Sequence, residues 1–182
     1  EKAHLDRVQA LYDERFACTD STRRAELYAQ INDEAQLAAQ YAAPNELDRL
    51  YTAMGERNLN GGTSYDYIMY SVDLPANRLP QWARIEAERF REPVFRLFQT
   101  ELETVYEEMN MRVIDNKDAL LRNAVNALLY QRHPYRRPVI GTVADLRNPS
   151  ISHMYAFYRT YYVPGNMAVL ISGDSDVDAT IQ

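Results

Sequence analysis

Cysteine is nearly absent from this chain, and so are long apolar runs and any excess of basic residues. The single Cys18 among 182 residues excludes an internal disulfide. No apolar stretch approaches the roughly 18 residues that a membrane-spanning helix needs. The net charge of −6 argues against a nucleic-acid partner, because binding phosphates requires a basic surface.

What remains is the composition of an ordinary folded domain. Hydrophobic residues make up 46% of the chain and charged residues 25%, with no low-complexity tract. A length of 182 residues is enough for one domain with a sizeable core. The chain opens on Glu1 without a methionine or a signal-like stretch, so we expect it to be a piece of a longer protein.

The first quarter of the sequence predicts two helices joined by a short turn. Apolar residues recur at helical spacing over 3–17, and a polar turn with helix-capping residues follows at 19–22. A second helix, rich in Ala, Gln and Glu, extends from there to Ala42. We therefore predict an antiparallel helical hairpin over 1–43 and a separate remainder over 44–182.

Helical and strand patterns alternate through that remainder and indicate an α+β fold. The strands are expected at 64–74, where Tyr, Ile, Met and Val gather, and at 167–171, an apolar run that we expect to be buried on both faces. The expected helices begin at Asn45, Pro75, Phe95, Ala119 and Ser150. An antiparallel sheet covered by helices is the architecture that this order predicts.

Four glutamates crowd one helical segment, at positions 101, 103, 107 and 108. Glu101 and Glu108 lie seven residues apart, so they share one face of a helix. Leu102, Val105 and Met109 flank that face, which predicts that it borders the core, where carboxylates need a partner or a metal. On these residues alone, a solvated acidic face is the other interpretation.

Four stretches, in the same order, resemble the pitrilysin/insulinase family of zinc metallopeptidases. They are NGGTSYD at 60–66, TELETVYEEMN at 100–110, HPY with PVIG at 133–141, and FYRTYYVPGNMAVLISGD at 157–174. Together they cover the chain from about Pro44 to its end. The resemblance implies the N-terminal, zinc-bearing domain of such a peptidase, present in part.

The resemblance also implies roles for the clustered glutamates. In this family an H-x-x-E-H helix supplies two zinc-binding histidines and a general base, and a later glutamate is the third ligand. By resemblance Glu108 is that metal ligand, with Glu107 as the alternative. Glu101 would be an accessory catalytic carboxylate that orients the ligands and tunes their basicity.

The stretch Asn60, Gly61, Gly62 and Thr63 corresponds to the family's entry into a substrate-binding edge strand. A peptide substrate would lie beside that strand and pair with its main chain. Two glycines would let a peptide backbone approach closely, and they depart from the alanine and aromatic residue usual in the family. A plain loop pair of glycines is the competing interpretation.

No H-x-x-E-H motif is present, and His4 is the only histidine in the first third. Either the hairpin is an insertion that follows an upstream motif, or the protein is a non-catalytic relative acting as scaffold or peptide-binding subunit. We favour the first and expect part of a Zn²⁺-dependent endopeptidase, completed by a homologous second domain or subunit. This chain alone is expected to be inactive. The expected compartment is the periplasm, with the cytoplasm as the alternative.

Overall fold

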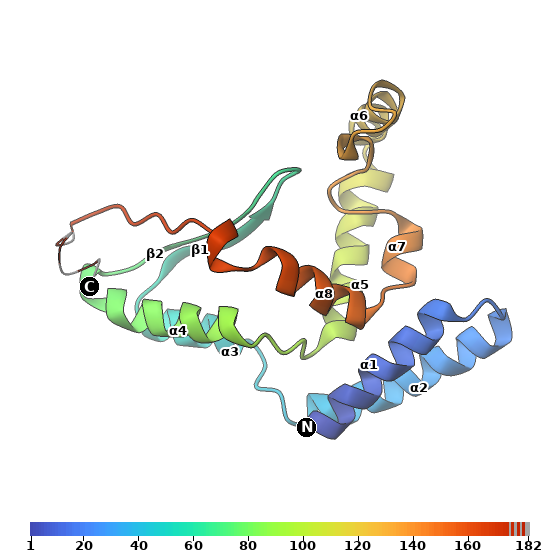
Figure 1. Cartoon of the computed structure of the whole chain (residues 1–182), viewed down its shortest axis with the longest axis horizontal. Coiled ribbons are helices and arrows are strands. Elements are labelled where there is room, and N and C mark those ends of the chain that lie inside the picture. The colour runs from blue at the N-terminus through green and yellow to red at the C-terminus, as the bar shows by residue number, and fades with distance from the viewer. Residues whose placement is uncertain (175, 177, 179, 181–182) are drawn as a thin grey trace. The chain divides into compact units, whose positions relative to one another are not determined.

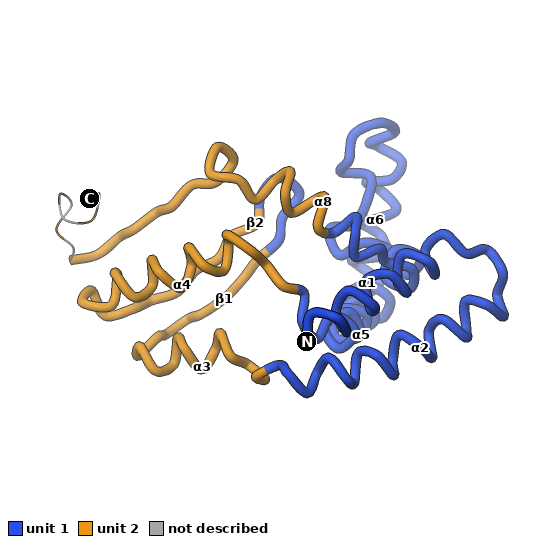
Figure 2. The backbone as a smooth tube through the Cα atoms, turned by 60° about the horizontal axis from the view of Figure 1, so that its bottom comes forward, with its two compact units in different colours: residues 1–42, 63–67, 95–154 blue, residues 43–62, 68–94, 155–182 orange. Residues whose placement is uncertain are grey.

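The structure is a computed structural model that describes residues 1–174, 176, 178 and 180. The chain divides into two compact units, which Figure 2 draws in different colours. Unit 1 comprises residues 1–42, 63–67 and 95–154, and unit 2 comprises residues 43–62, 68–94 and 155–182. The sequence division expected at residue 43 stays a prediction, as does the hairpin's origin as an insertion.

Helices dominate the fold, with one two-stranded sheet among the described residues (Figure 1). The helices are α1 Lys2–Ala17, α2 Ser21–Ala39, α3 Glu46–Ala53, α4 Leu79–Arg91, α5 Phe98–Met109, α6 Lys117–Leu129, α7 Val143–Arg147 and α8 Ile151–Tyr161. The strands are β1 Arg57–Thr63 and β2 Ile68–Asp73. Short 3-10 turns lie at Ala76–Arg78, Pro134–Arg136 and Pro164–Asn166, and a π-helical turn at Asn110–Ile114. The predicted α+β class is confirmed.

The helical hairpin predicted from the sequence is present as α1 and α2, which pack along each other (Figure 1). Its turn is fixed by Asp20, whose side chain accepts a hydrogen bond from the Arg23 backbone N–H at 2.7 Å and so caps α2. Leu27 and Ile31 on α2 have no exposed surface, and Leu11 on α1 is 2% exposed. The spacing of these residues puts them on the facing sides of the two helices, so the hairpin has its own apolar seam.

Asp13 on α1 connects the hairpin to the start of α8. Its carboxylate accepts hydrogen bonds from Ser150 Oγ at 2.7 Å, from the Ser152 N–H at 3.3 Å and from Ser152 Oγ. Ser150 is buried, and its Oγ in turn accepts from the His153 N–H at 3.1 Å, which caps α8. These contacts all lie within unit 1, and they hold the first turn of α8 against α1.

The sheet differs from the expected strand over 64–74. β1 and β2 form a hairpin joined by residues 64–67, where the Ser64 N–H donates to the Tyr67 carbonyl at 2.8 Å, so only 68–73 of that stretch is strand. Residues 60–63, expected as a loop before the strand, belong to β1. The apolar composition of 64–74 also suits a strand covered on both faces, but the large side chains Ile68, Met69 and Tyr70 are exposed.

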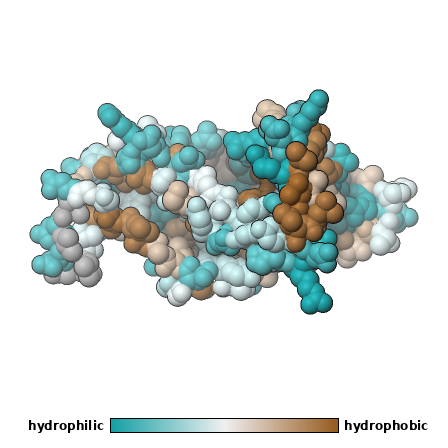
Figure 3. Space-filling view, turned by 90° about the horizontal axis from the view of Figure 1, so that it is seen from above, coloured by the Kyte–Doolittle hydropathy of each residue, from teal (hydrophilic) through white to brown (hydrophobic). Residues whose placement is uncertain are grey.

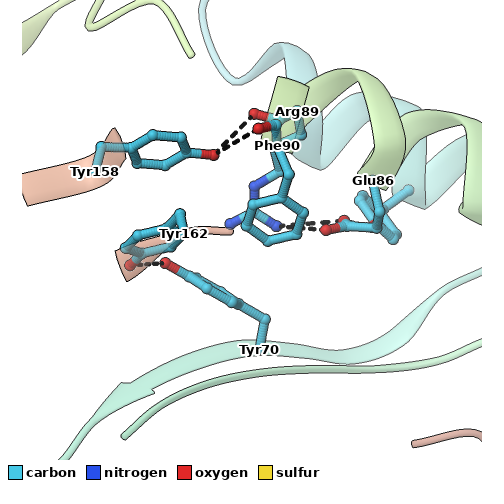
Figure 4. A network of polar contacts seen from close by, with 7 residues as sticks. Tyr70, Glu86, Arg89, Phe90, Tyr158 and Tyr162 are labelled. Carbon is cyan, nitrogen blue, oxygen red and sulfur yellow. Dashed lines mark hydrogen bonds and ion pairs between the residues drawn. The ribbon is translucent and has the colours of Figure 1, made fainter. Parts of the chain in front are cut away.

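In unit 2 an aromatic and charged network packs α4 and α8 against β2 (Figure 4). The Arg89 guanidinium lies 4.4 Å from the centre of the Tyr70 ring and pairs with Glu86 at 3.2 Å. Tyr162 stacks on Tyr158, with ring centres 4.4 Å apart, and its hydroxyl lies 3.1 Å from that of Tyr70. Helix α4 therefore covers the sheet at Tyr70, where the Arg89 side chain packs over the tyrosine ring.

The apolar run 167–171 is not a strand in this structure. Val169 is 68% exposed and Leu170 is 89% exposed, so the expectation of a strand buried on both faces is wrong. A strand requires a neighbour for its N–H and C=O groups, and no described residue pairs with this segment. The sequence also suits one more helix capped by Asp176 or Asp178, which falls largely outside the described residues.

Apolar side chains are exposed elsewhere too, and the face drawn in Figure 3 carries several hydrophobic patches among hydrophilic residues. On α6 three leucines are largely exposed: Leu121 is 64%, Leu128 78% and Leu129 69% exposed. Within the part of the chain described, no helix has both the length and the apolar character to cross a bilayer.

Candidate functional site

Helix α5 carries the glutamates on which the site prediction depends. The predicted helix over 95–115 is confirmed with a later start, because Leu97 adopts a left-handed conformation (φ 56°) and α5 begins at Phe98. Glu101 and Glu108 share one face but are separated by about 10 Å along the axis at the usual rise per residue. The two carboxylates therefore start two helical turns apart, and among the described residues they do not form a metal-binding cluster with a third ligand.

Burial differs between the two glutamates. Glu101 is exposed, whereas the Glu108 side chain is 39% exposed and neighbours the buried Met109. The prediction that this face borders the core is therefore wrong at Glu101. The buried residue of α5 is its last one, Met109, so the helix is most buried at the end that carries Glu108. Glu107, the alternative ligand, is exposed.

Glu108 has a cationic partner in this structure. The Arg112 Nε lies 3.1 Å from Glu108 Oε1, one helical turn further on, and the Arg112 side chain is 75% exposed. Exposed pairs of this kind contribute only about 0.3–0.5 kcal/mol. The contact orients the Glu108 carboxylate without binding it strongly, so the carboxylate is available to another ligand.

The other end of α5 is held by the helical hairpin. Tyr12 donates a hydrogen bond to Gln99 Oε1, and the Gln99 Nε2 donates to Tyr28 Oη at 2.8 Å and to Glu103 Oε1 at 3.0 Å. The Tyr12 and Phe98 rings meet edge to face with centres 5.2 Å apart. All these residues lie in unit 1, so the hairpin fixes the first turn of the helix that carries Glu108.

The described residues do not make a zinc site by themselves. A catalytic zinc takes three protein ligands, and among the residues described no three His, Cys, Asp or Glu side chains cluster where they could hold a metal. Glu108 could serve as one carboxylate ligand, because it is partly exposed and its pairing with Arg112 is weak. The other two protein ligands are not present beside it among the described residues.

The predicted peptide-binding residues lie in β1. Asn60, Gly61 and Gly62 are in unit 2 and Thr63 is in unit 1, and all four are exposed. Because the sheet has two strands within the described residues, each strand has one open edge. A Cβ at Gly62 would meet nothing within 4 Å, and one at Gly61 would meet the Tyr70 ring at 3.4 Å. The protein's own packing therefore does not require glycine at Gly62.

Two features near Glu108 escaped the sequence reasoning. The Glu108–Arg112 pair follows the i, i+4 spacing that stabilises exposed helices and was readable from the sequence. The π-helical turn Asn110–Ile114 begins two residues after Glu108 and has no sequence signal of its own, although such turns often accompany functional residues.

The model of the insulinase family, described as peptidase family M16, matches residues 36–143. That range is more than half of the chain and includes β1, β2 and all of α5. The chain belongs to the insulinase family. The resemblance seen in the sequence is thereby confirmed, together with its hydrolase, protease and metalloprotease character at the level of the family.

Individual insulinase-family relatives bear names of the same kind. The chain is 36% identical over 75 residues to a Bacillus subtilis protein named uncharacterized zinc protease YmfH, covering 41% of this chain and 17% of that protein. It is 34% identical over 83 residues to the uncharacterized zinc protease ML0855 of Mycobacterium leprae, covering 46% of this chain and 18% of that protein. It is 27% identical over 131 residues to the zinc protease PqqE of Helicobacter pylori, covering 71% of this chain and 29% of that protein. The chain thus spans less than a third of the length of the relatives it matches.

Proposed function

We propose that this chain is part of a zinc-dependent endopeptidase that hydrolyses peptides with a metal-activated water. The observation that carries the proposal is the insulinase-family match over 36–143, which contains Glu108, together with relatives named zinc proteases. In this proposal Glu108 is the single zinc ligand that the chain provides. Two histidines and a general base would come from an H-x-x-E-H helix elsewhere in the full-length protein.

Glu101 has a supporting role in this proposal. It lies about 10 Å along the helix from Glu108 and would act by orienting the groups around the site. Its exposure leaves it open to such partners. Glu107 remains the alternative ligand. Because Arg112 pairs with Glu108, the Glu108 carboxylate is the better oriented of the two.

Peptide binding is proposed at the open edge of β1. An extended substrate adds to such an edge by main-chain hydrogen bonds, and residues 60–63 are exposed, with no side chain at Gly61 or Gly62. The space around Gly62 is consistent with a close approach by another backbone. A homologous second domain or subunit would complete the binding cleft, and the periplasm is the proposed compartment.

A non-catalytic scaffold or peptide-binding subunit is the second candidate. The open edge of β1 supports it, because main-chain pairing with a peptide at that edge needs no metal. This alternative predicts peptide binding at β1 without zinc.

Zinc content separates the two proposals. The full-length protein is purified beside its Glu108→Gln and Glu107→Gln variants, and zinc is measured by elemental analysis. About one zinc per molecule in the wild type and in Glu107→Gln, with a large loss in Glu108→Gln, is the expected result. A loss in Glu107→Gln alone would transfer the ligand role to Glu107, and no zinc in any of the three proteins would favour the scaffold. The 182-residue chain itself is expected to show no peptidase activity, so zinc-dependent cleavage by it would refute the proposed division of the site.

A further inference from the structure

The helical hairpin contains a hollow that the peptidase proposal does not use. It lies at the turn between α1 and α2, has a volume of about 500 Å³, and is lined by Arg15, Thr19, Ser21, Arg24, Ala25 and Tyr28. All six residues belong to unit 1. The lining contains two guanidinium groups, three hydroxyl groups and no carboxylate.

The two arginines are the unusual members of this lining. Neither Arg15 nor Arg24 forms an ion pair with any carboxylate among the described residues, whereas the adjacent Arg23 pairs with both Glu14 at 2.7 Å and Glu26 at 3.0 Å. Burial and then the nearby positive charge of Arg24 lower the pKa of Arg15. Two like charges therefore face one hollow without a counter-charge, an arrangement that an anion would relieve.

The same groups have donors to spare. Arg15 uses Nη1 to donate to the Arg147 carbonyl at 2.7 Å and to Asn148 Oδ1 at 3.5 Å, and its Nε is fully buried, which leaves the Nη2 group without a partner among the described residues. Arg24 uses Nη1 to donate to the carbonyls of Arg15 and Cys18 at 3.2 and 3.1 Å. A guanidinium has five N–H donors, so each arginine keeps unused donors. Within the described part of the chain, the Thr19 and Ser21 hydroxyl groups form no side-chain hydrogen bond.

Nearby carboxylates are already committed elsewhere. Glu14 and Glu26 bind Arg23, and the Asp20 side chain caps α2 through the Arg23 N–H. The ring of Tyr28 lies under Arg15, 5.3 Å from the guanidinium carbon, and holds it at the hollow. The cations are thus fixed in place by backbone carbonyls and an aromatic ring, none of which neutralises their charge.

We propose that this hollow is a binding site for a phosphate group, held by Arg15 and Arg24 with hydroxyl contacts from Thr19 and Ser21. Arginine's planar fork matches the oxygens of a phosphate, and hydroxyl groups supply further donors. The phosphate could be a free ion or part of a phosphate ester. A volume of about 500 Å³ exceeds what one phosphate fills, so it leaves room for the organic part of an ester beside Tyr28.

Isothermal titration calorimetry on the 182-residue chain tests this site, with inorganic phosphate as one probe, phenyl phosphate as the other and chloride at matched ionic strength as the blank. We expect saturable binding of phosphate that falls at least about tenfold in Arg24→Gln, the loss expected when a charged donor is removed. Arg7→Gln makes the same charge change on α1, outside the hollow and without breaking an ion pair among the described residues, and should bind as the wild type does. Tighter binding of phenyl phosphate would identify an ester as the ligand, and equal or weaker binding a free ion.

A second pair of variants keeps the test decisive if Arg24→Gln loses helix content, because Arg24 also ties the end of α1. Ser21→Asp puts a negative charge into the hollow at the first residue of α2, where an acidic side chain is favourable for the helix. Thr22→Asp adds the same charge one residue further on, outside the lining. Phosphate affinity should fall in Ser21→Asp only. Equal affinities within either pair, or no phosphate binding by the wild type beyond the chloride blank, would overturn the proposal.

Discussion

The seam between α1 and α2 gives the sharpest stability prediction. Leu27 has no exposed surface, so Leu27→Ala removes three buried carbon groups at about 0.8 kcal/mol each and leaves a cavity that adds to this loss. The expected decrease in the free energy of unfolding is about 3 kcal/mol. In urea, with a slope of roughly 1–3 kcal/mol per molar, the midpoint should fall by about 1–3 M.

Leu37→Ala is the matched control, because Leu37 lies on the same helix and is 43% exposed. The change in helix propensity is the same in both variants, so the difference between them reports burial alone. Urea unfolding followed by far-UV circular dichroism should show less than about 1 kcal/mol for Leu37→Ala. Equal losses in the two variants would refute the assignment of Leu27 to a packed seam.

Two further predictions concern polar groups of unit 1. Burial raises the pKa of Tyr12, so its neutral phenol is favoured in the folded state. The free energy of unfolding should be constant below about pH 10 and fall as the pH rises beyond it. Between pH 8 and pH 11, urea unfolding should show a smaller fall in Tyr12→Phe than in the wild type, and identical falls would contradict the assignment. Asp13→Asn replaces one acceptor oxygen that faces the Ser150 and Ser152 donors and should destabilise by about 1–3 kcal/mol, whereas the exposed Asp6→Asn should change stability by less than about 0.5 kcal/mol. Similar urea midpoints for Asp13→Asn and Asp6→Asn would show that the Asp13 contacts contribute nothing.

Local signals in the sequence predicted the helices well. Apolar residues at helical spacing and a capping Asp20 identified α1 and α2, and Gly55, which follows α3 with a positive φ of 82°, is a glycine of the kind that ends helices. Such features depend on residues three or four positions apart, so the sequence shows both partners. The family, too, was readable from four ordered stretches, and the match over 36–143 confirmed it.

The strands were the least predictable elements. The stretches 64–74 and 167–171 have similar β-forming composition, yet only the first contains a strand, because β1 lies beside it and gives its backbone groups partners. Composition reports how well a segment suits a sheet, and the neighbouring strand decides whether one forms. The hairpin turn at 64–67 likewise became visible only from the pairing of Ser64 with Tyr67.

The sequence by itself determined the helices apart from the short α7, the family, and the glutamates that the candidate site requires. Only the tertiary structure decided which of those glutamates is half-buried, that Glu108 pairs with Arg112, and that the hairpin holds the start of α5 through Tyr12 and Gln99. It also brought Arg15 and Arg24 to one hollow without a counter-charge. The physical reason is the range of the interactions: helix formation is local, whereas burial and charge pairing depend on which distant segments come into contact.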